Sequence, residues 1–277
     1  MSSTTEILKY VAQQLNIYIG LFVCTTGFIG GLLNIIVFTT LKTFRETTCG
    51  TYLTAASITN LAQSLTALFP ILNNGFSYAP LSSPIYCKFR YSVAQYFGLF
   101  SFVSMCMATI DQFLSMSKYR HLNTIRLARY HIVFAGIACF LHAMLSFIFY
   151  NSNGNACVIT NSIFAKYYTY FYLPVLLGFL PVTITALFSL MALVKIQSNT
   201  DREVGVIRLG HDRQLTAMTL VHALFIFLTI IPYVISFVYT LSIPPKTAEE
   251  AARNQLIYTV TGLWSFEGFA VSFVPKQ

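Results

Sequence analysis

Residues 91–121 read YSVAQYFGLFSFVSMCMATIDQFLSMSKYRH, and this stretch decides the fold. Its first twenty residues, Tyr91 to Ile110, contain no Asp, Glu, Lys or Arg, Asp111 then ends the run, and a group of basic residues follows. A helix of about twenty uncharged residues matches the thickness of a bilayer. The stretch therefore predicts a membrane-spanning helix that carries one carboxylate near its end.

The rest of the chain has the same character. Of its 277 residues, 56% are hydrophobic and only 9% are charged, and the mean hydropathy is +0.65, whereas soluble domains have about 25% charged residues. The stretches lack the alternation of apolar and polar residues that barrel strands need. We therefore expect an all-α membrane protein, a seven-transmembrane helix bundle, with spans at about 17–41, 50–72, 88–117, 130–150, 165–195, 213–241 and 254–275.

The basic residues predict which side of the membrane each loop faces. With the N-terminus outside, the cytoplasmic loops hold eleven Lys and Arg and the opposite side holds six, as the positive-inside rule requires. We thus expect a multi-pass plasma-membrane protein with an extracellular N-terminus (1–16), a transmembrane domain (17–275) and a truncated cytoplasmic end (276–277). This topology explains the net charge of +8 through attraction to anionic membrane lipids, without a nucleic-acid partner.

Two of the six cysteines fall on the outer, oxidising side in this topology. Cys87 begins the third span, and Cys157 lies in the loop after the fourth. A disulfide between them would close a loop of about 70 residues and contribute roughly 4 kcal/mol in the chain-entropy model. Two free thiols are the alternative, but these are the only exterior cysteines, which favours the disulfide.

Seven spans, an outer N-terminus and this disulfide resemble the rhodopsin-like (class A) G-protein-coupled receptors, of which the chain looks like a divergent member. The resemblance covers about residues 17–275. It implies an extracellular ligand and a heterotrimeric G protein as partners, with no catalytic residues, cofactor or metal. The short outer N-terminus favours a small molecule or a short peptide as the ligand.

The opening stretch matches the inner motif of this family with two changes. The family's Asp-Arg-Tyr aligns with Asp111-Gln112-Phe113, at the family's separation of 24 residues from Cys87. In the family, the Arg pairs with the Asp at rest and reaches the G protein on activation, through a charge and a donor fork that Gln112 lacks. Asp111 either has a specific partner of this kind or is a solvated helix-end residue, which the helix dipole disfavours.

Two asparagines match further positions of the family. Asn34 stands at the helix-one Asn, as a polar contact to the second and seventh helices or as an isolated amide in a small-residue face. Asn60 replaces the Asp that forms the family's sodium pocket, to which Ser101 corresponds. A neutral amide supplies no counter-charge for a desolvated cation, so we expect no sodium site and a hydrogen-bonding role for Asn60.

Prolines match the family in the fifth and sixth spans, where Pro181 and Pro232 predict kinks. Ile230 replaces the family's Trp two residues before the second proline, and residues 272–276 do not match its Asn-Pro-x-x-Tyr motif. The resemblance places a ligand pocket among the outer halves of four helices. The candidates, whose aromatic members are also plausible packing residues, are Tyr91, Tyr96, Phe97, Tyr172, Tyr233, Tyr258 and Glu267. Glu267 is a ligand counter-charge or a polar contact to the two asparagines.

Other classes fit less well. A small transporter or channel predicts internal repeats and charges near the midplane, but the sequence has no repeat and only Glu267 near that depth. An intramembrane enzyme needs a nucleophile with a base, an aspartate pair or a His cluster, and His142 and His222 are isolated in the sequence. A receptor-shaped protein that does not signal, as a dimer partner or decoy, stays open because of Gln112 and Ile230.

Overall fold

The computed structural model describes residues 3–76, 83–117, 124–153, 156–200, 221, 224–225, 228–240, 242–243 and 245–270. Within these ranges nearly all of the chain is helical, and two short strands form a small hairpin. The long helices are α1 (Ser3–Thr40), α3 (Thr48–Phe76), α4 (Pro84–Met116), α5 (Ile125–Phe149), α7 (Leu180–Thr200) and α9 (Ala248–Ala270). The shorter elements are α2 (Lys42–Arg45), β1 (Tyr150–Asn153), β2 (Ala156–Ile159), α6 (Ser162–Tyr167), the π-helix η3 (Tyr168–Phe179) and a helix over Leu228–Thr240.

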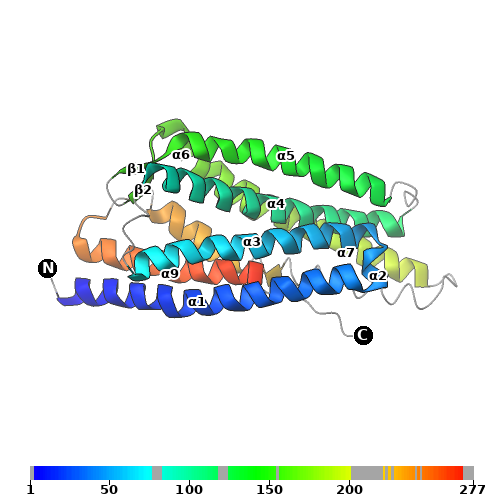
Figure 1. Ribbon diagram of the computed structural model, residues 1–277, viewed down its shortest axis with the longest axis horizontal. Coiled ribbons are helices and arrows are strands. Elements are labelled where there is room, and N and C mark those ends of the chain that lie inside the picture. Colours follow the sequence, from blue (N-terminus) through cyan, green and yellow to red (C-terminus); the bar gives the residue numbers. More distant parts are fainter. Residues whose placement is uncertain are drawn as a thin grey trace.

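The long helices lie side by side along one axis (Figure 1). The N-terminus of α1 and the β1–β2 hairpin lie at one end of this bundle, which we call the disulfide end. The short helix α2 lies at the other end, which we call the Asp111 end. Because the described helices begin and end at these two ends, residues far apart in the sequence meet there.

Four of the described helices are long and apolar enough to cross a membrane: Thr4–Thr40, Pro84–Ser115, Ile125–Phe149 and Ser162–Lys195. They correspond to the first, third, fourth and fifth predicted spans. The second and seventh spans are α3 and α9, and the described part of the sixth is Leu228–Thr240. The prediction of an all-α bundle is confirmed.

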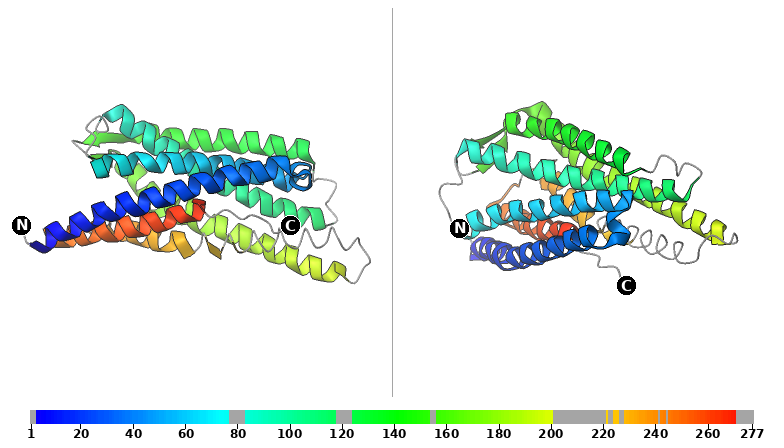
Figure 2. Two further views of the ribbon diagram at one scale, coloured as in Figure 1. Left: turned by 60° about the horizontal axis from the view of Figure 1, so that its bottom comes forward. Right: turned by 45° about the vertical axis from the view of Figure 1, so that its right-hand side comes forward.

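The first helix is longer than its apolar stretch. It begins at Ser3 rather than near residue 17, and its 38 residues span about 57 Å, whereas the hydrocarbon layer is about 30 Å thick. Residues 3–16 contain no Gly or Pro, and Thr5 and Ala12 are buried. α1 packs along the shorter helix α9 (Figure 2, left). Most of residues 1–16, which were expected to form an extracellular N-terminus, therefore belong to the helix α1.

The fifth span changes its helical form in the middle. The α-helix α6 passes into the π-helix η3, which contains Pro174, and returns to α-helix at Leu180. A proline cannot donate a backbone hydrogen bond, and π-helical turns are rare and often lie at functional sites. The predicted kink residue, Pro181, lies just after this segment, and its carbonyl accepts a hydrogen bond from the Thr185 hydroxyl at 2.7 Å.

Glycines let α1 approach α3 closely. A Cβ atom at Gly20 would lie 2.8 Å from Cδ1 of Ile71, and one at Gly31 would lie 3.4 Å from Cβ of Leu61. Close packing of this kind holds helices together in membranes, where burial of apolar surface gives little driving force. The small-residue face predicted around Asn34 is therefore the α1–α3 contact.

Candidate functional site

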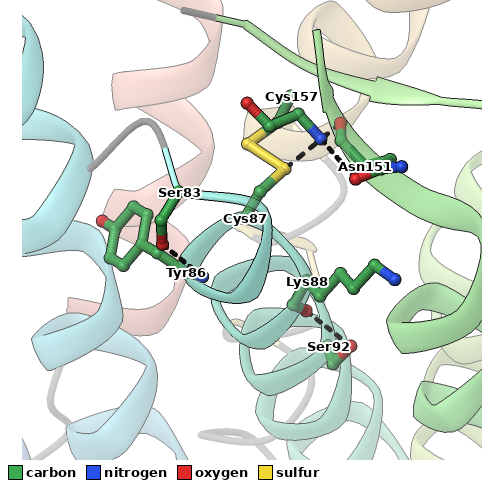
Figure 3. Close-up of a disulfide and its surroundings, with 8 residues drawn as sticks. Ser83, Tyr86, Cys87, Lys88, Ser92, Asn151 and Cys157 are labelled. Carbon is green, nitrogen blue, oxygen red and sulfur yellow. Dashed lines mark hydrogen bonds between the residues drawn. A yellow bond between two sulfur atoms is a disulfide. The ribbon is translucent and has the colours of Figure 1, made fainter. Parts of the chain in front are cut away.

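The predicted disulfide is present at the disulfide end (Figure 3). Cys87 lies in the first turn of α4, whose start is capped by Ser83, and it is bonded to Cys157 on β2. The two Cα atoms are 5.7 Å apart, across a sequence separation of 70. β2 pairs antiparallel with β1, in a register that places Ser152 opposite Cys157. The bond therefore ties the hairpin that follows α5 to the start of α4.

Next to the disulfide, six aromatic residues from five elements form a group that we call the aromatic cluster. The Tyr91 ring stacks on Tyr150 with centroids 4.2 Å apart and an interplanar angle of 9°. The Tyr233 and Tyr258 hydroxyl oxygens lie 3.3 Å apart. Edge and tilted contacts join these pairs into the full cluster of Tyr91, Tyr150, Tyr168, Tyr233, Phe237 and Tyr258.

The aromatic cluster contains three of the predicted pocket residues, Tyr91, Tyr233 and Tyr258. The sequence did not single out the other three. Phe237 lies one helical turn after Tyr233, a spacing that places both on one face of a helix. Tyr150, by contrast, carries no signal in the sequence, because it begins a strand at the end of a predicted span.

The remaining aromatic candidates pack between helices. Tyr96 contacts Phe97 and, across from α4 to α5, Phe140, with ring centroids 5.2 and 6.3 Å away. Tyr172 is only 1% exposed and stacks on His142 at 5.2 Å. The side chain of Glu267, on α9, lies outside the described part of the structure.

A buried polar network that the sequence did not reveal joins α4, α5 and α6. His142 Nδ1 lies 2.9 Å from Gln95 Nε2, and His142 Nε2 lies 2.6 Å from the Tyr167 hydroxyl. The Ser146 hydroxyl donates to Gln95 Oε1. His142, isolated in the sequence, is thus hydrogen-bonded on both sides. Among the described residues, no three His, Cys, Asp or Glu side chains gather into a group that could hold a metal ion.

At the Asp111 end, the Asp111 carboxylate lies between α4 and α3. It is only 8% exposed, and its Oδ2 accepts a hydrogen bond from the Thr48 hydroxyl at 2.5 Å. Gln112 is 4% exposed, and the Phe113 ring meets Phe188 of α7 edge to face at 5.7 Å. Asp111 therefore faces α3 and Phe113 faces α7, Gln112 is buried between neighbouring side chains, and Asp111 is not a solvated helix-end residue.

In the middle of the bundle, the Ser101 hydroxyl donates a hydrogen bond to Oδ1 of Asn60. The two residues that correspond to the family's sodium pocket are therefore hydrogen-bonded to each other. Asn34 differs, because its Oδ1 is buried and accepts no hydrogen bond within the described residues.

The two positions of the sixth span that were compared with the family, Ile230 and Pro232, differ in exposure. Ile230, where the family has Trp, is 7% exposed and packs against Phe102 of α4. Pro232 is exposed. Residues 272–276, which correspond to the family's seventh-helix motif, lie outside the described residues.

Comparison with known families agrees with this geometry. The profile of the 7 transmembrane receptor (rhodopsin family) matches residues 30–266. The match covers most of the chain, so the chain belongs to the rhodopsin family of seven-transmembrane receptors. It is a multi-pass plasma-membrane protein, and its family is one of receptors rather than enzymes. No curated protein sequence matches the chain at a significant level.

Proposed function

We propose that this receptor carries a small-molecule or short-peptide signal from outside the cell to an intracellular G protein. The observation that carries the proposal is that one helix, α4, contributes to both candidate regions. Tyr91 of the aromatic cluster and Asp111 lie on α4, about 30 Å apart along its axis. A ligand that binds at the aromatic cluster and favours one packing of the helices would therefore also shift the conformation of the Asp111 end.

In this proposal the disulfide end faces the outside of the cell. Disulfides persist in oxidising compartments, and the Cys87–Cys157 bond lies at the same end as the N-terminus (Figure 1). The distribution of basic residues favours the same orientation. The Asp111 end would then face the G protein.

The Asp111 end would be held at rest by a contact between helices rather than by a pair of adjacent charges. The bond from Thr48 to Asp111 joins α3 to α4, so it breaks only if the helices separate or turn. Gln112 lacks the charge of the family's Arg, and a carboxylate next to an amide gains less than one next to a guanidinium. We therefore expect weak coupling to the G protein in the natural sequence.

Substitution of Gln112 tests this proposal. We expect Gln112→Arg to raise G-protein activation in cells about fivefold or more, the lower end of ordinary coupling factors, because Arg supplies a charge and five donors. Gln112→Met, which has a similar volume without donors, is the matched control and should not raise it. Surface expression of each variant is measured in the same cells.

The main alternative is a receptor-shaped membrane protein that does not signal. Suppose that the natural sequence and Gln112→Arg both reach the cell surface, but that G-protein activation stays at background for both, with and without candidate ligands. In that case this alternative replaces the proposal. A transporter or channel would instead give a measurable flux in the same cells.

A further inference from the structure

A basic residue without a carboxylate partner lies beside the aromatic cluster. Arg90 is half-buried near the start of α4, and its Cζ lies 5.3 Å from the centre of the Tyr91 ring. Within the described residues, no carboxylate pairs with its guanidinium group. The Tyr91 ring returns part of the hydration free energy that the half-buried guanidinium group loses, and an anion would return more.

The sequence limits which carboxylates could lie near Arg90. No Asp or Glu occurs between Glu46 and Asp111, or between Asp111 and Asp201. Helices α4 and η3 and strand β1 therefore bring tyrosines and a guanidinium to the aromatic cluster, but no acid. Helix α9, which contributes Tyr258, carries Glu249 and Glu250 in its first turn, about two turns before Tyr258. At the start of α9, Glu250 accepts a hydrogen bond from the backbone N–H of Lys246 at 2.9 Å.

This charge pattern separates ligand classes. A ligand with an ammonium group would meet tyrosine rings, but it would also meet Arg90, and no described carboxylate in the cluster would balance the two positive charges. A ligand with an acidic group would instead form a charge-assisted, bidentate pair with Arg90. Tyrosine hydroxyls can donate further hydrogen bonds to such a group, and the Tyr258 side chain is 37% exposed.

We infer, on the basis of the proposed receptor function, that the ligand of the aromatic cluster is an organic acid. Its carboxylate or phosphate group pairs with Arg90 and accepts from the Tyr258 hydroxyl. Its apolar body lies against the rings of the cluster, where aromatic contacts add affinity beyond the buried area. The acid group comes either from a soluble ligand or from an anionic lipid headgroup, which share this chemistry.

Binding can be tested without any signalling readout. The full chain is reconstituted in phosphatidylcholine nanodiscs, and its Tm is measured with phenylbutyrate and with its uncharged and cationic analogues, phenylbutyramide and phenylbutylamine. We expect the acid to raise the Tm by about 3 °C or more and the analogues to raise it less. A second preparation with added phosphatidylglycerol distinguishes the lipid source, because there the rise would come from the lipid and phenylbutyrate would add little.

Variants identify the residue that carries the effect. In Arg90→Gln the rise is expected to disappear, in Arg90→Lys part of it should remain, and Lys166→Gln, which removes an exposed base from α6, should leave it unchanged. The Tm of each variant without additive shows that it folds. The inference is overturned if no anion raises the Tm, if phenylbutylamine raises it as much, or if the effect survives in Arg90→Gln. A failure of G-protein activation leaves these measurements intact, so the two proposals fail separately.

Discussion

At the scale of single residues, the hydrogen bond from Thr48 to Asp111 is the contact that most constrains the Asp111 end. Thr48→Val keeps the shape of the side chain and removes the donor. Loss of a hydrogen bond to a carboxylate that stays buried costs about 1.5–3 kcal/mol, so we expect a lower Tm for the purified receptor. Thr51→Val is the control, because among the described residues the Thr51 hydroxyl bonds only to the Thr47 carbonyl, four residues earlier in the chain, at 3.2 Å. An equal loss of Tm in both variants would contradict the role of the Thr48 contact.

Asn60 gives a second prediction at this scale, about sodium. Because its neutral amide already accepts from Ser101, replacing sodium by potassium in the buffer should leave the Tm of the natural sequence unchanged. Asn60→Asp supplies the missing counter-charge, and we expect sodium to raise its Tm by about 2 °C or more relative to potassium. Sodium dependence in the natural sequence would refute the prediction, and Asn60→Ser is a neutral variant that should stay insensitive.

Single residues also show how far the sequence determines the site. The spacing from Cys87 identified Asp111, and the resemblance identified Asn60 with Ser101. The partner of Asp111 was out of reach, since Thr48 lies 63 residues away and many hydroxyl residues could have filled that role. Gln95 could not be identified as the partner of His142 for a similar reason. The partners in a buried network depend on how each helix is rotated about its axis, and a continuous run of apolar residues does not determine that rotation.

At the scale of elements, the turn from α2 into α3 depends on Gly50. A Cβ atom there would lie 2.1 Å from the backbone oxygen of Phe44, and a backbone atom cannot move aside as a side-chain tip can. We expect Gly50→Ala to destabilise the receptor by about 2 kcal/mol or more, measured as a lower Tm. Gly98→Ala is the matched control, since the nearest atom to its added Cβ is Nε2 of Gln63 at 4.0 Å. If both variants melt alike, the turn tolerates displacement and the prediction is wrong.

Element boundaries were the least predictable part of the fold. Hydropathy locates the part of a helix inside the bilayer, so it missed the outer turns of α1 from Ser3 onwards. It also cannot distinguish an α-helix from a π-helix, since both satisfy the backbone within one segment. The π-helix around Pro174 was therefore missed, although the prolines at 174 and 181 were visible in the sequence.

At the scale of the whole molecule, the seven-helix bundle and the disulfide between Cys87 and Cys157 followed from the sequence because each rests on a strong constraint. A bilayer admits only segments whose backbone groups are satisfied internally, and the topology predicted from the basic residues places only two cysteines on the oxidising side. The meeting of five elements in the aromatic cluster did not follow, because it depends on how the helices pack. The orientation of the bundle relative to the membrane is the remaining whole-molecule property, and it determines which end binds a ligand.

Labelling of cysteines on intact cells tests that orientation. After mild reduction, a membrane-impermeant maleimide should modify Cys157 from outside, because its side chain is half-buried and the proposed topology places it in the extracellular space, whereas Cys87 is fully buried. Cys49, at the Asp111 end (Figure 1), should react only after the membrane is permeabilised and the protein unfolded, since it is buried.

The control is the variant with both Cys87→Ser and Cys157→Ser, which should show no labelling from outside. An epitope tag before Ser3 should be accessible to antibody on the same intact cells, because the start of α1 lies at the disulfide end. Labelling that requires permeabilisation for the tag and for Cys157 would invert the bundle and place the aromatic cluster in the cytosol. In that orientation neither an extracellular ligand at Arg90 nor a G protein at Asp111 is physically accessible, so this single experiment decides between the proposed receptor and its opposite.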